Sequence, residues 1–403
     1  MRVRVLCFLL LPFSVQAQHN FRVLHAFGNG NDGAGVYDSV TLDANGNVYG
    51  STAGGGAHKD GIVFRLTPGP KGYWKQTILH TFPSSAKDGA GPRGGVVLAQ
   101  DGTLYGTTQV FGKNDRGVAF SLTPTGDGWR EAILYSFCSR QGCEDGGEPW
   151  GNLVLDSSSG NIFGTGFVAF ELSPGRPGWK NATLHNFTGK NGDGYLPLAG
   201  PIRDGAGNFY GTTNLGGGSK NCDAGCGTVW ELSPPSWDTQ GWTEHILHAF
   251  GVDDTLGFPE TGQLARDGQG NLYGTTATGG PLRGGAVFKL VPPPSRSSGK
   301  WKETILHGFG EDQNGYLPEG GVTLDNAGNL YGTTGTGGTG CGVVFKLSPK
   351  SNGTWEYTLL HTFHQSDGCS PVANLTFGPD GKLYGTTSIG GAYGGGVVFQ
   401  LTP

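Results

Sequence analysis

Carboxylates recur in this sequence at one position, directly before a glycine and four residues ahead of a proline. The motif Asp-Gly-x-x-Pro contains Asp88, Asp145, Asp193 and Asp367. Two glutamates lie beside the prolines of related loops and differ from copy to copy. Carboxylate oxygens that converge on one point suit Ca²⁺ or the hydroxyls of a polyol. The candidate ligand-binding residues are therefore Asp88, Asp145, Glu148, Asp193, Glu319 and Asp367.

A structural role explains the same aspartates. The carboxylate of an Asp-Gly turn commonly accepts hydrogen bonds from the backbone of its own turn. Repetition in most copies favours this interpretation, because a specific site normally differs between copies. Both interpretations stay open. The ligand-binding one predicts a ring of carboxylates around a central channel, with Ca²⁺ as the candidate cofactor.

An internal repeat supplies the elements that must position these loops. The pattern Tyr-Gly-Thr-Thr is followed by an apolar pair and then by Trp-x4-Leu-His-x-Phe or a close variant. Each unit of about 55 residues predicts four short β-strands, near the period of kelch-type propellers. Counting two variants, the first pattern begins at Tyr49, Tyr105, Phe163, Tyr210, Tyr273, Tyr331 and Tyr384.

The last unit lacks its fourth strand, and the start of the chain supplies a matching one. The segment Leu24-His25-Ala26-Phe27 stands alone before the first unit. A closed ring explains this, since an open array would leave unpaired edges at both ends. The sequence therefore predicts an all-β fold, a seven-bladed β-propeller with four-stranded blades, closed by the N-terminal strand pairing with the last blade.

One position of the repeat is histidine in six copies, which suggests metal binding or acid–base chemistry. These histidines lie on the outer strands of different blades, so they cannot converge on one ion. Hydrogen bonding within the scaffold is the expected role of His25, His80, His185, His248, His307 and His361. No Walker A loop, nucleophile elbow or His-Glu-x-x-His occurs, so no catalytic residue is assigned.

The first 17 residues have the pattern of a secretory signal peptide. Arg2 and Arg4 precede a short apolar run, and Val15-Gln16-Ala17 forms a cleavage site. The run is too short to span a bilayer. The predicted organisation is a signal peptide over 1–17 and a single propeller domain over 18–403, secreted or periplasmic, monomeric and without membrane insertion.

Six cysteines remain after the signal peptide, and an even count in an exported protein favours disulfides over metal binding. In a propeller all six fall on the face that carries the connecting loops. Two pairs would each close one loop, and the third would join adjacent loops between the sixth and seventh blades. These pairs are Cys138 with Cys143, Cys222 with Cys226, and Cys341 with Cys369.

Composition excludes two classes of partner. The 77 glycines in 403 residues fall at fixed places between apolar segments, so they mark turns rather than disorder. The net charge is −5 and no basic run is present. Nucleic acids and anionic membranes both require a concentrated positive patch, so neither is an expected partner.

The combined repeat LDxxGNLYGTT–GG–VVFKLxP–W–LHxF resembles the GloVer-type tandem repeats of exported bacterial proteins, a choice-of-anchor repeat family. The resemblance covers essentially the whole mature chain, and three motifs per unit make it specific. It implies an extracytoplasmic repeat protein and no particular activity. Many such proteins carry a C-terminal anchor, whereas here the sequence stops directly after a predicted strand.

Two functions compete on this basis. The first is a non-catalytic binding or scaffold protein that takes a glycan, a cell-wall polymer or a protein on its loop face. The second is a hydrolase resembling calcium-dependent lactonase and esterase propellers. The hydrolase requires blade-specific acidic or amide side chains around the channel. Glu148 and Glu319 are the carboxylates that vary between blades.

Overall fold

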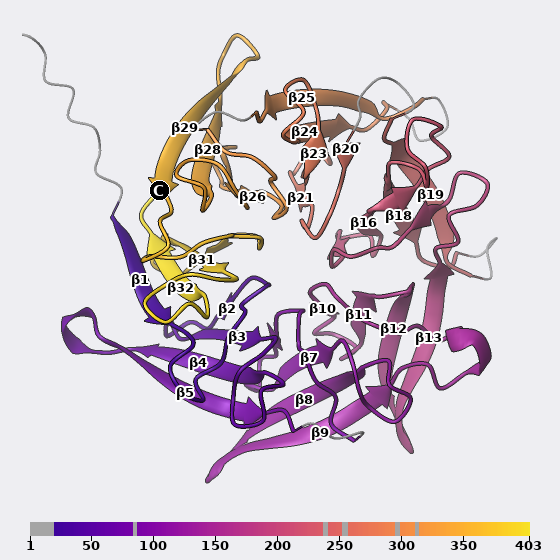
Figure 1. The fold of residues 1–403 in the computed structure, drawn as a ribbon. Helices are drawn as coiled ribbons and strands as arrows, with labels where there is room; N and C mark the ends of the chain where they lie inside the picture. The colour runs from indigo at the N-terminus through magenta and orange to yellow at the C-terminus, as the bar shows by residue number, and fades with distance from the viewer. Residues whose placement is uncertain (1–19, 84–86, 237–240, 252–256, 295–298, 311–313) are drawn as a thin grey trace, which may run out of the picture.

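The computed structural model describes residues 20–83, 87–236, 241–251, 257–294, 299–310 and 314–403. Seven four-stranded antiparallel sheets surround a central axis as the blades of a propeller (Figure 1). The predicted seven-bladed fold is confirmed. The predicted signal peptide, residues 1–17, lies outside the described residues.

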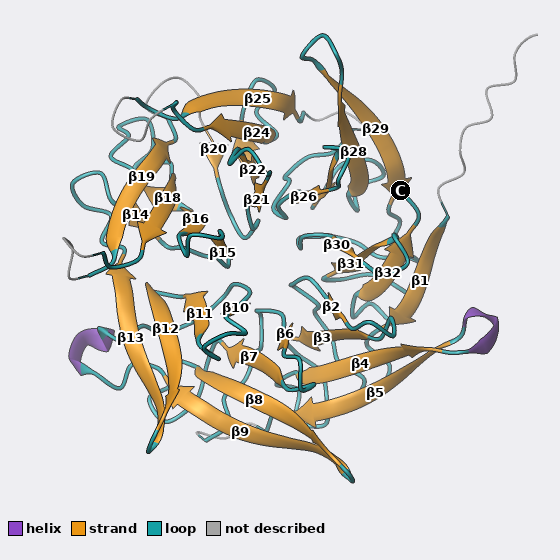
Figure 2. Ribbon diagram, turned by 180° about the vertical axis from the view of Figure 1, so that it is seen from behind, coloured by secondary structure: helices purple, strands orange, loops and turns teal. Residues whose placement is uncertain are grey.

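The strands of each blade follow one another from the axis to the rim (Figure 2). The innermost strands are β2 (Thr41–Leu42), β6 (Val97–Leu98), β10 (Val154–Leu155), β15 (Ile202–Arg203), β21 (Ala265–Arg266), β26 (Thr323–Leu324) and β30 (Thr376–Phe377). The second strands are β3 (Val48–Thr52), β7 (Leu104–Thr108), β11 (Ile162–Thr165), β16 (Phe209–Thr213), β22 (Leu272–Thr276), β27 (Leu330–Thr334) and β31 (Leu383–Thr387).

The two outer strands of each blade are longer than its innermost strand. The third strands are β4 (Ile62–Pro68), β8 (Val118–Thr125), β12 (Val168–Gly175), β18 (Thr228–Ser233), β24 (Ala286–Val291), β28 (Val343–Pro349) and β32 (Val397–Leu401). The rim strands are β5 (Trp74–Thr81), β9 (Gly128–Ser136), β13 (Gly178–Asn186), β19 (Thr243–Ala249), β25 (Lys302–Gly308), β29 (Trp355–Thr362) and β1 (Phe21–Ala26).

Short elements occur in the loops between these strands. Two small strand pairs join β14 (Gly194–Tyr195) to β17 (Leu215–Gly216), and β20 (Gly257–Phe258) to β23 (Thr278–Gly279). Two 3₁₀ turns are η1 (Pro70–Gly72) and η2 (Gln141–Cys143). Among the described residues no helix is long and apolar enough to cross a membrane.

The first hairpin of a blade is closed by a recurring set of side-chain hydrogen bonds. Asp325 accepts them from the N–H groups of Ala327 and Asn329, at 2.9 and 2.8 Å. The hydroxyl of Tyr331 donates to the same carboxylate at 3.1 Å. Burial and the charge of Asp325 together raise the pKa of Tyr331. The repeated tyrosine therefore serves the scaffold of its own blade.

The glycine that follows this tyrosine makes room for an aromatic ring. Gly332 lies opposite Phe345 in the antiparallel pair β27–β28. A Cβ atom at Gly332 would lie 2.6 Å from the Phe345 ring, closer than van der Waals contact allows. Phe345 is fully buried between blades, where it packs with Phe309 and Leu347. The glycine of Tyr-Gly therefore recurs because a side chain at its position would clash with the buried aromatic ring.

The N-terminal strand closes the ring, as predicted. β1 pairs antiparallel with β32, with Phe21 opposite Leu401 and Ala26 opposite Val397. Phe21 also stacks on His361 of the sixth blade, with the ring centroids 3.6 Å apart. The first and last described strands are thus held by backbone pairing and by packing between neighbouring blades (Figure 1).

Three disulfides cross-link the loop face. Cys138 bonds to Cys143 and Cys222 to Cys226, so each pair closes a single loop. Cys341 bonds to Cys369 and joins the sixth blade to the loop that enters the seventh. These are the pairs that the repeat suggests. Three disulfides are typical of proteins that fold in an oxidising, extracytoplasmic compartment.

Candidate functional site

A cavity of about 410 Å³ lies around the propeller axis on the loop face. Its wall contains one equivalent residue from every blade, the one that follows the loop proline, or Val36 in the first blade. Each such residue leads into an innermost strand, which explains why it reaches the axis. In order around the ring these residues are Tyr37, Arg93, Trp150, Leu198, Glu260, Glu319 and Val372.

In at least four blades the residue before the loop proline, or before Val36, is hydrogen-bonded both to its own blade and to the preceding one. Leu317 adopts a φ of 58°, a left-handed conformation that is unfavourable for a branched residue. Its N–H donates to Gly284 of the preceding blade, and its carbonyl accepts from Gly335 of its own blade. Ser370 repeats the arrangement, with a φ of 56° and a hydrogen bond to Cys341. These bonds fix the backbone on which the residue after the proline is oriented toward the axis.

Blades one to three place a cation between two aromatic rings. The guanidinium carbon of Arg93 lies 4.8 Å from the ring centroid of Tyr37 and 4.6 Å from that of Trp150. Such contacts attract the cation to the faces of the rings. In the described part of the chain, Arg93 has no carboxylate partner and donates no hydrogen bond. Its N–H groups are therefore available to a ligand.

The opposite wall, in blades five and six, is acidic. Burial raises the pKa of Glu260. Burial and the charge of Glu260 raise the pKa of Glu319 to about 7. Neither side chain receives a hydrogen bond from the residues that the structure describes. Two half-buried carboxyl groups without donors are costly for a fold and suit a ligand that brings donors.

A polar network on the blade one to three side forms part of the cavity floor. Asn152 reaches across the second blade and donates to Asp38 at 2.9 Å. The N–H of Gly95 donates to the same carboxylate at 2.9 Å. Burial raises the pKa of Asp38 to about 6, although the hydrogen bonds from Ser39, Gly95 and Asn152 oppose this effect. These hydrogen bonds thus hold the Asp38 carboxylate in the floor of the cavity.

A second network mirrors the first across the axis. Asn374 of the seventh blade accepts from the N–H of Gln263 in the fifth at 3.0 Å and from that of Gly321 at 3.1 Å. Its amide also donates to the Gln263 carbonyl at 3.1 Å. Gly95 and Gly321 carry no side chain between the blades that these bonds connect. The two networks hold the cavity walls at fixed positions.

The aspartates of the Asp-Gly motif turn away from the cavity and toward the rim strands. Asp145 accepts from the Tyr135 hydroxyl at 2.5 Å and from the N–H of Ser139 at 2.7 Å. Asp367 contacts His361 at 3.1 Å. The charge of Asp88 acts on His80 and helps to raise the pKa of Glu131, after burial as the main cause. Asp88, Asp145, Asp193 and Asp367 do not line the axial cavity.

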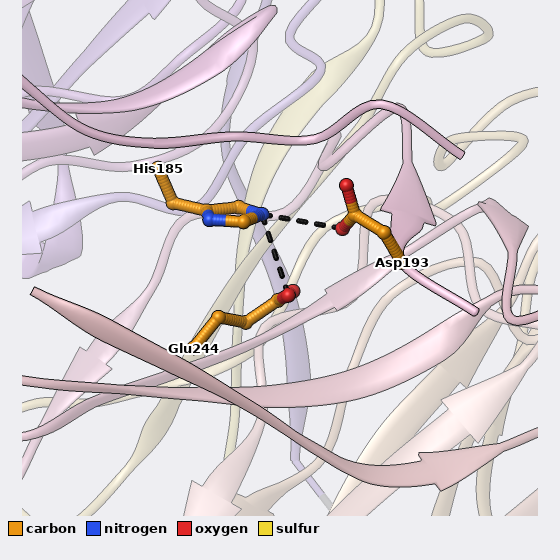
Figure 3. Close-up of side chains that lie close together, drawn as sticks. All are labelled: His185, Asp193 and Glu244. Carbon is orange, nitrogen blue, oxygen red and sulfur yellow. Dashed lines mark hydrogen bonds and ion pairs between the residues drawn. The ribbon is translucent and has the colours of Figure 1, made fainter. Parts of the chain in front are cut away.

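Asp193 belongs to a three-residue cluster between the third and fourth blades (Figure 3). His185 Nε2 lies 3.2 Å from Asp193 Oδ1 and 3.4 Å from Glu244 Oε2. Burial and the charge of Asp193 raise the pKa of Glu244 to about 8. One ligand atom from each side chain lies within 4.8 Å of the others, which is close enough to hold a divalent cation.

Pairing of rim histidines with carboxylates recurs around the ring. Nε2 to carboxylate distances are 3.2 Å for His25 with Asp32, 3.3 Å for His80 with Glu131, 3.7 Å for His248 with Glu303 and 3.1 Å for His361 with Asp367. Burial lowers the pKa of His25, His80 and His361. Such recurrence is expected of a scaffold contact between strands and loops. His185 differs in contacting two carboxylates, those of Asp193 and Glu244.

The two variable glutamates have different positions. Glu148 precedes its proline and forms an ion pair with Arg116 of the preceding blade. Glu319 follows its proline and lines the cavity. The structure therefore brings Glu319 together with Glu260, Arg93 and Trp150, which the sequence alone did not single out. The available signal was the residue after each loop proline, because its chemistry varies around the ring while its neighbours repeat.

The sequence pattern of the Gloeobacter/Verrucomicrobia repeat matches residues 12–224 and 219–403. The chain belongs to this repeat family. The resemblance inferred from the three motifs is thereby confirmed. No curated protein matches the chain in sequence.

Solved structures share the propeller fold at low sequence identity. A putative 6-phosphogluconolactonase from Bacteroides uniformis is 15% identical, with a TM-score of 0.51 over 84% of this chain and 88% of that one. An ancestral GH74 enzyme is 12% identical, with a TM-score of 0.58 over 93% of this chain and 48% of that one. The extracellular domain of a putative hybrid two-component system from B. thetaiotaomicron is 14% identical, with a TM-score of 0.52 over 95% and 41%. Such identities establish the fold alone.

Proposed function

We propose that this chain is an exported, non-catalytic binding protein that takes a glycan into the axial cavity of its loop face. The observation that carries the proposal is the ring of post-proline residues. They range from aromatic to cationic, acidic and aliphatic around the ring, and they present a tryptophan, a tyrosine, an arginine and two glutamates to one cavity. A scaffold role alone would leave this position as repetitive as the rest of the blade.

The composition of the wall suits a sugar. Trp150 and Tyr37 offer large faces on which the C–H groups of a sugar ring can stack. Glu260 and Glu319 offer oxygens that can bind hydroxyl groups. A cavity of about 410 Å³ matches the size of common small-ligand sites. A glycan end or a short oligosaccharide segment therefore fits better than a protein surface, which would require a broad flat contact.

Isothermal titration calorimetry with a panel of oligosaccharides tests this function. Trp150→Ala removes the stacking face and should weaken binding roughly 10- to 100-fold, the usual cost of truncating a central aromatic contact. Tyr393→Ala is a matched control, because Tyr393 is an aromatic residue of the same face, is 57% exposed and does not line the cavity. Equal effects of both substitutions, or no binding of any oligosaccharide by the unaltered protein, would contradict the proposal.

A calcium-dependent lactonase- or esterase-like hydrolase is the second candidate. The observation in its favour is the adjacent pair Glu260 and Glu319, which lines the cavity together with Asn214. A divalent cation would relieve the repulsion between the two carboxylates and use oxygen ligands of the kind that Ca²⁺ prefers. Metal analysis and a thermal-shift titration with Ca²⁺ separate the candidates. Binding of Ca²⁺ that Glu319→Gln abolishes, together with lactone or ester hydrolysis, would favour the hydrolase.

A further inference from the structure

We infer that the glycan taken by the axial cavity carries a carboxylate, as in a uronic acid, and that Arg93 binds this carboxylate. The inference rests on the proposed glycan-binding function and adds the class of sugar. It follows from the charged groups that line the cavity. Arg93, Glu260 and Glu319 have no side-chain hydrogen bond among the described residues, whereas the third acidic group, Asp38, is hydrogen-bonded.

Arg93 is held in a way that leaves its hydrogen-bonding edge free. The rings of Tyr37 and Trp150 contact the guanidinium at 4.8 and 4.6 Å between its central carbon and the ring centroids. These ring contacts use no hydrogen bond, so the planar fork of five N–H donors has no acceptor among the described residues. A planar carboxylate accepts two of these donors side by side. The flanking rings also immobilise the side chain before a ligand arrives, which reduces the entropy lost on binding.

The acidic groups of the described chain near this part of the cavity are already engaged. Asp38 is buried and receives hydrogen bonds from Ser39, Gly95 and Asn152. Glu148, on the same loop as Trp150, pairs with Arg116 instead. The partly buried positive charge of Arg93 therefore has no counterion among the described residues. A ligand anion would supply one.

The opposite wall orients the ligand. Glu260 and Glu319 repel a carboxylate and accept hydrogen bonds from hydroxyl groups, so the acid group must lie toward Arg93 and the hydroxyls toward the glutamates. The pKa of Glu319, raised to about 7, keeps part of the pair protonated near neutral pH. A partly protonated pair both donates and accepts, which matches sugar hydroxyls better than it matches an ammonium group. A neutral sugar would leave the charge of Arg93 without a counterion.

Calorimetry on the mature protein tests the inference with three probes of equal length: an oligogalacturonate, its fully methyl-esterified form and a sulfated neutral oligosaccharide. We expect the free acid to bind at least tenfold more tightly than the ester, since a hydrogen-bonded charge pair usually contributes a factor of this size. Arg93→Gln should remove this preference, so that the free acid and the ester bind the variant with equal affinity. Arg116→Gln, a matched change on the same face at a residue paired with Glu148, should leave both affinities unchanged.

The outcomes separate this inference from the function on which it rests. If the free acid and the ester bind equally well, or if Arg93→Gln keeps the preference, the acid-sugar assignment is overturned while glycan binding stands. Preference for the sulfated probe would overturn the carboxylate assignment in favour of a sulfate ester. Failure of the unaltered protein to bind any of the probes overturns both. Far-ultraviolet circular dichroism and the melting temperature show whether each variant remains folded.

Discussion

Asp145 and Glu319 come from the same type of proline loop, and their environments are opposite. Asp145 lies at the repeated Asp-Gly position, and Glu319 lies after the proline. Burial alone would raise the pKa of Asp145, but hydrogen bonds from Tyr135, Arg140 and Ser139 outweigh it and lower the pKa. Glu319 has no such donors among the described residues, and burial raises its pKa to about 7. The fold satisfies one carboxylate with hydrogen bonds and leaves the other without donors in the described part of the chain.

The two residues show how scaffold positions differ from candidate site positions in this repeat protein. Positions that repeat, such as the rim histidines and the Asp-Gly aspartates, have partners within the blades. The residues after the prolines vary around the ring and meet at the axis, and three of them, Arg93, Glu260 and Glu319, have no side-chain hydrogen bond among the described residues. A buried polar group without a partner reduces stability, so a fold that retains several of them at one place does so for another purpose.

The largest effect on stability should come from removing the Asp145 carboxylate, whose oxygens accept hydrogen bonds from the fold. Asp145→Ala leaves the Tyr135 hydroxyl and two loop N–H groups without an acceptor, and should lower the free energy of unfolding by about 3–5 kcal/mol. Because the folded-state pKa of Asp145 is lowered, its contribution is present above the unfolded pKa near 3.8 and is lost as the pH falls through the folded-state value. Urea unfolding at pH 7 measures the loss.

Glu319→Ala is the control for that change, because it removes a carboxylate without hydrogen-bond donors. It should lower the free energy of unfolding by less than about 1 kcal/mol. If Glu319→Ala destabilised the protein as strongly as Asp145→Ala, the distinction between the two loop positions would be wrong.

Glu319→Gln should have an intermediate effect on the free energy of unfolding, and it should stabilise the protein. The folded-state pKa of about 7 exceeds the reference value of 4.5, so the folded protein binds more protons than the unfolded chain between these values. Stability therefore falls as the pH rises through this window. The substitution removes the penalty and should stabilise the protein by about 1–3 kcal/mol at pH 8 and by almost nothing at pH 4.5. Melting temperatures of both proteins from pH 4.5 to 8 give the measurement, and a pH-independent difference would argue against an unpaired carboxyl group.

The smallest effect should come from Glu148, the other variable glutamate. Its ion pair with the partly exposed Arg116 lies outside the cavity, and surface pairs contribute little to stability. Glu148→Gln should change the free energy of unfolding by less than about 1 kcal/mol and leave oligosaccharide affinity unaltered. A marked loss of affinity in calorimetry would extend the site beyond the axial cavity and weaken the role given to the post-proline ring.

Much of the fold was predictable because each unit carries its own local signals. The Tyr-Gly-Thr-Thr strand, the apolar pair and the Trp-x4-Leu-His-x-Phe strand each mark one β-strand, and the copies can be counted. The isolated Leu24-His25-Ala26-Phe27 predicted the pairing of β1 with β32 that closes the ring. The paired cysteines could be assigned to loops once the blade order was known.

The site was predictable only in part. Variation between blades indicates both Glu319, which lines the cavity, and Glu148, which pairs with Arg116 of a neighbouring loop. Arg93, Trp150 and Glu260 were not selected, because an arginine, a tryptophan and a glutamate in three separate loops have no common motif. The raised pKa of Glu319 depends on Glu260, which lies in another blade.

The sequence by itself determined the number of blades, the strands of each blade and the way the ring closes, because these depend on short-range patterns repeated along the chain. The tertiary structure alone decided which side of each loop proline faces the axis. Residues separated by a whole blade in sequence become neighbours only when seven blades close into a ring. At Leu317 and Ser370, hydrogen bonds to two blades fix the backbone that leads to the inward-facing residue.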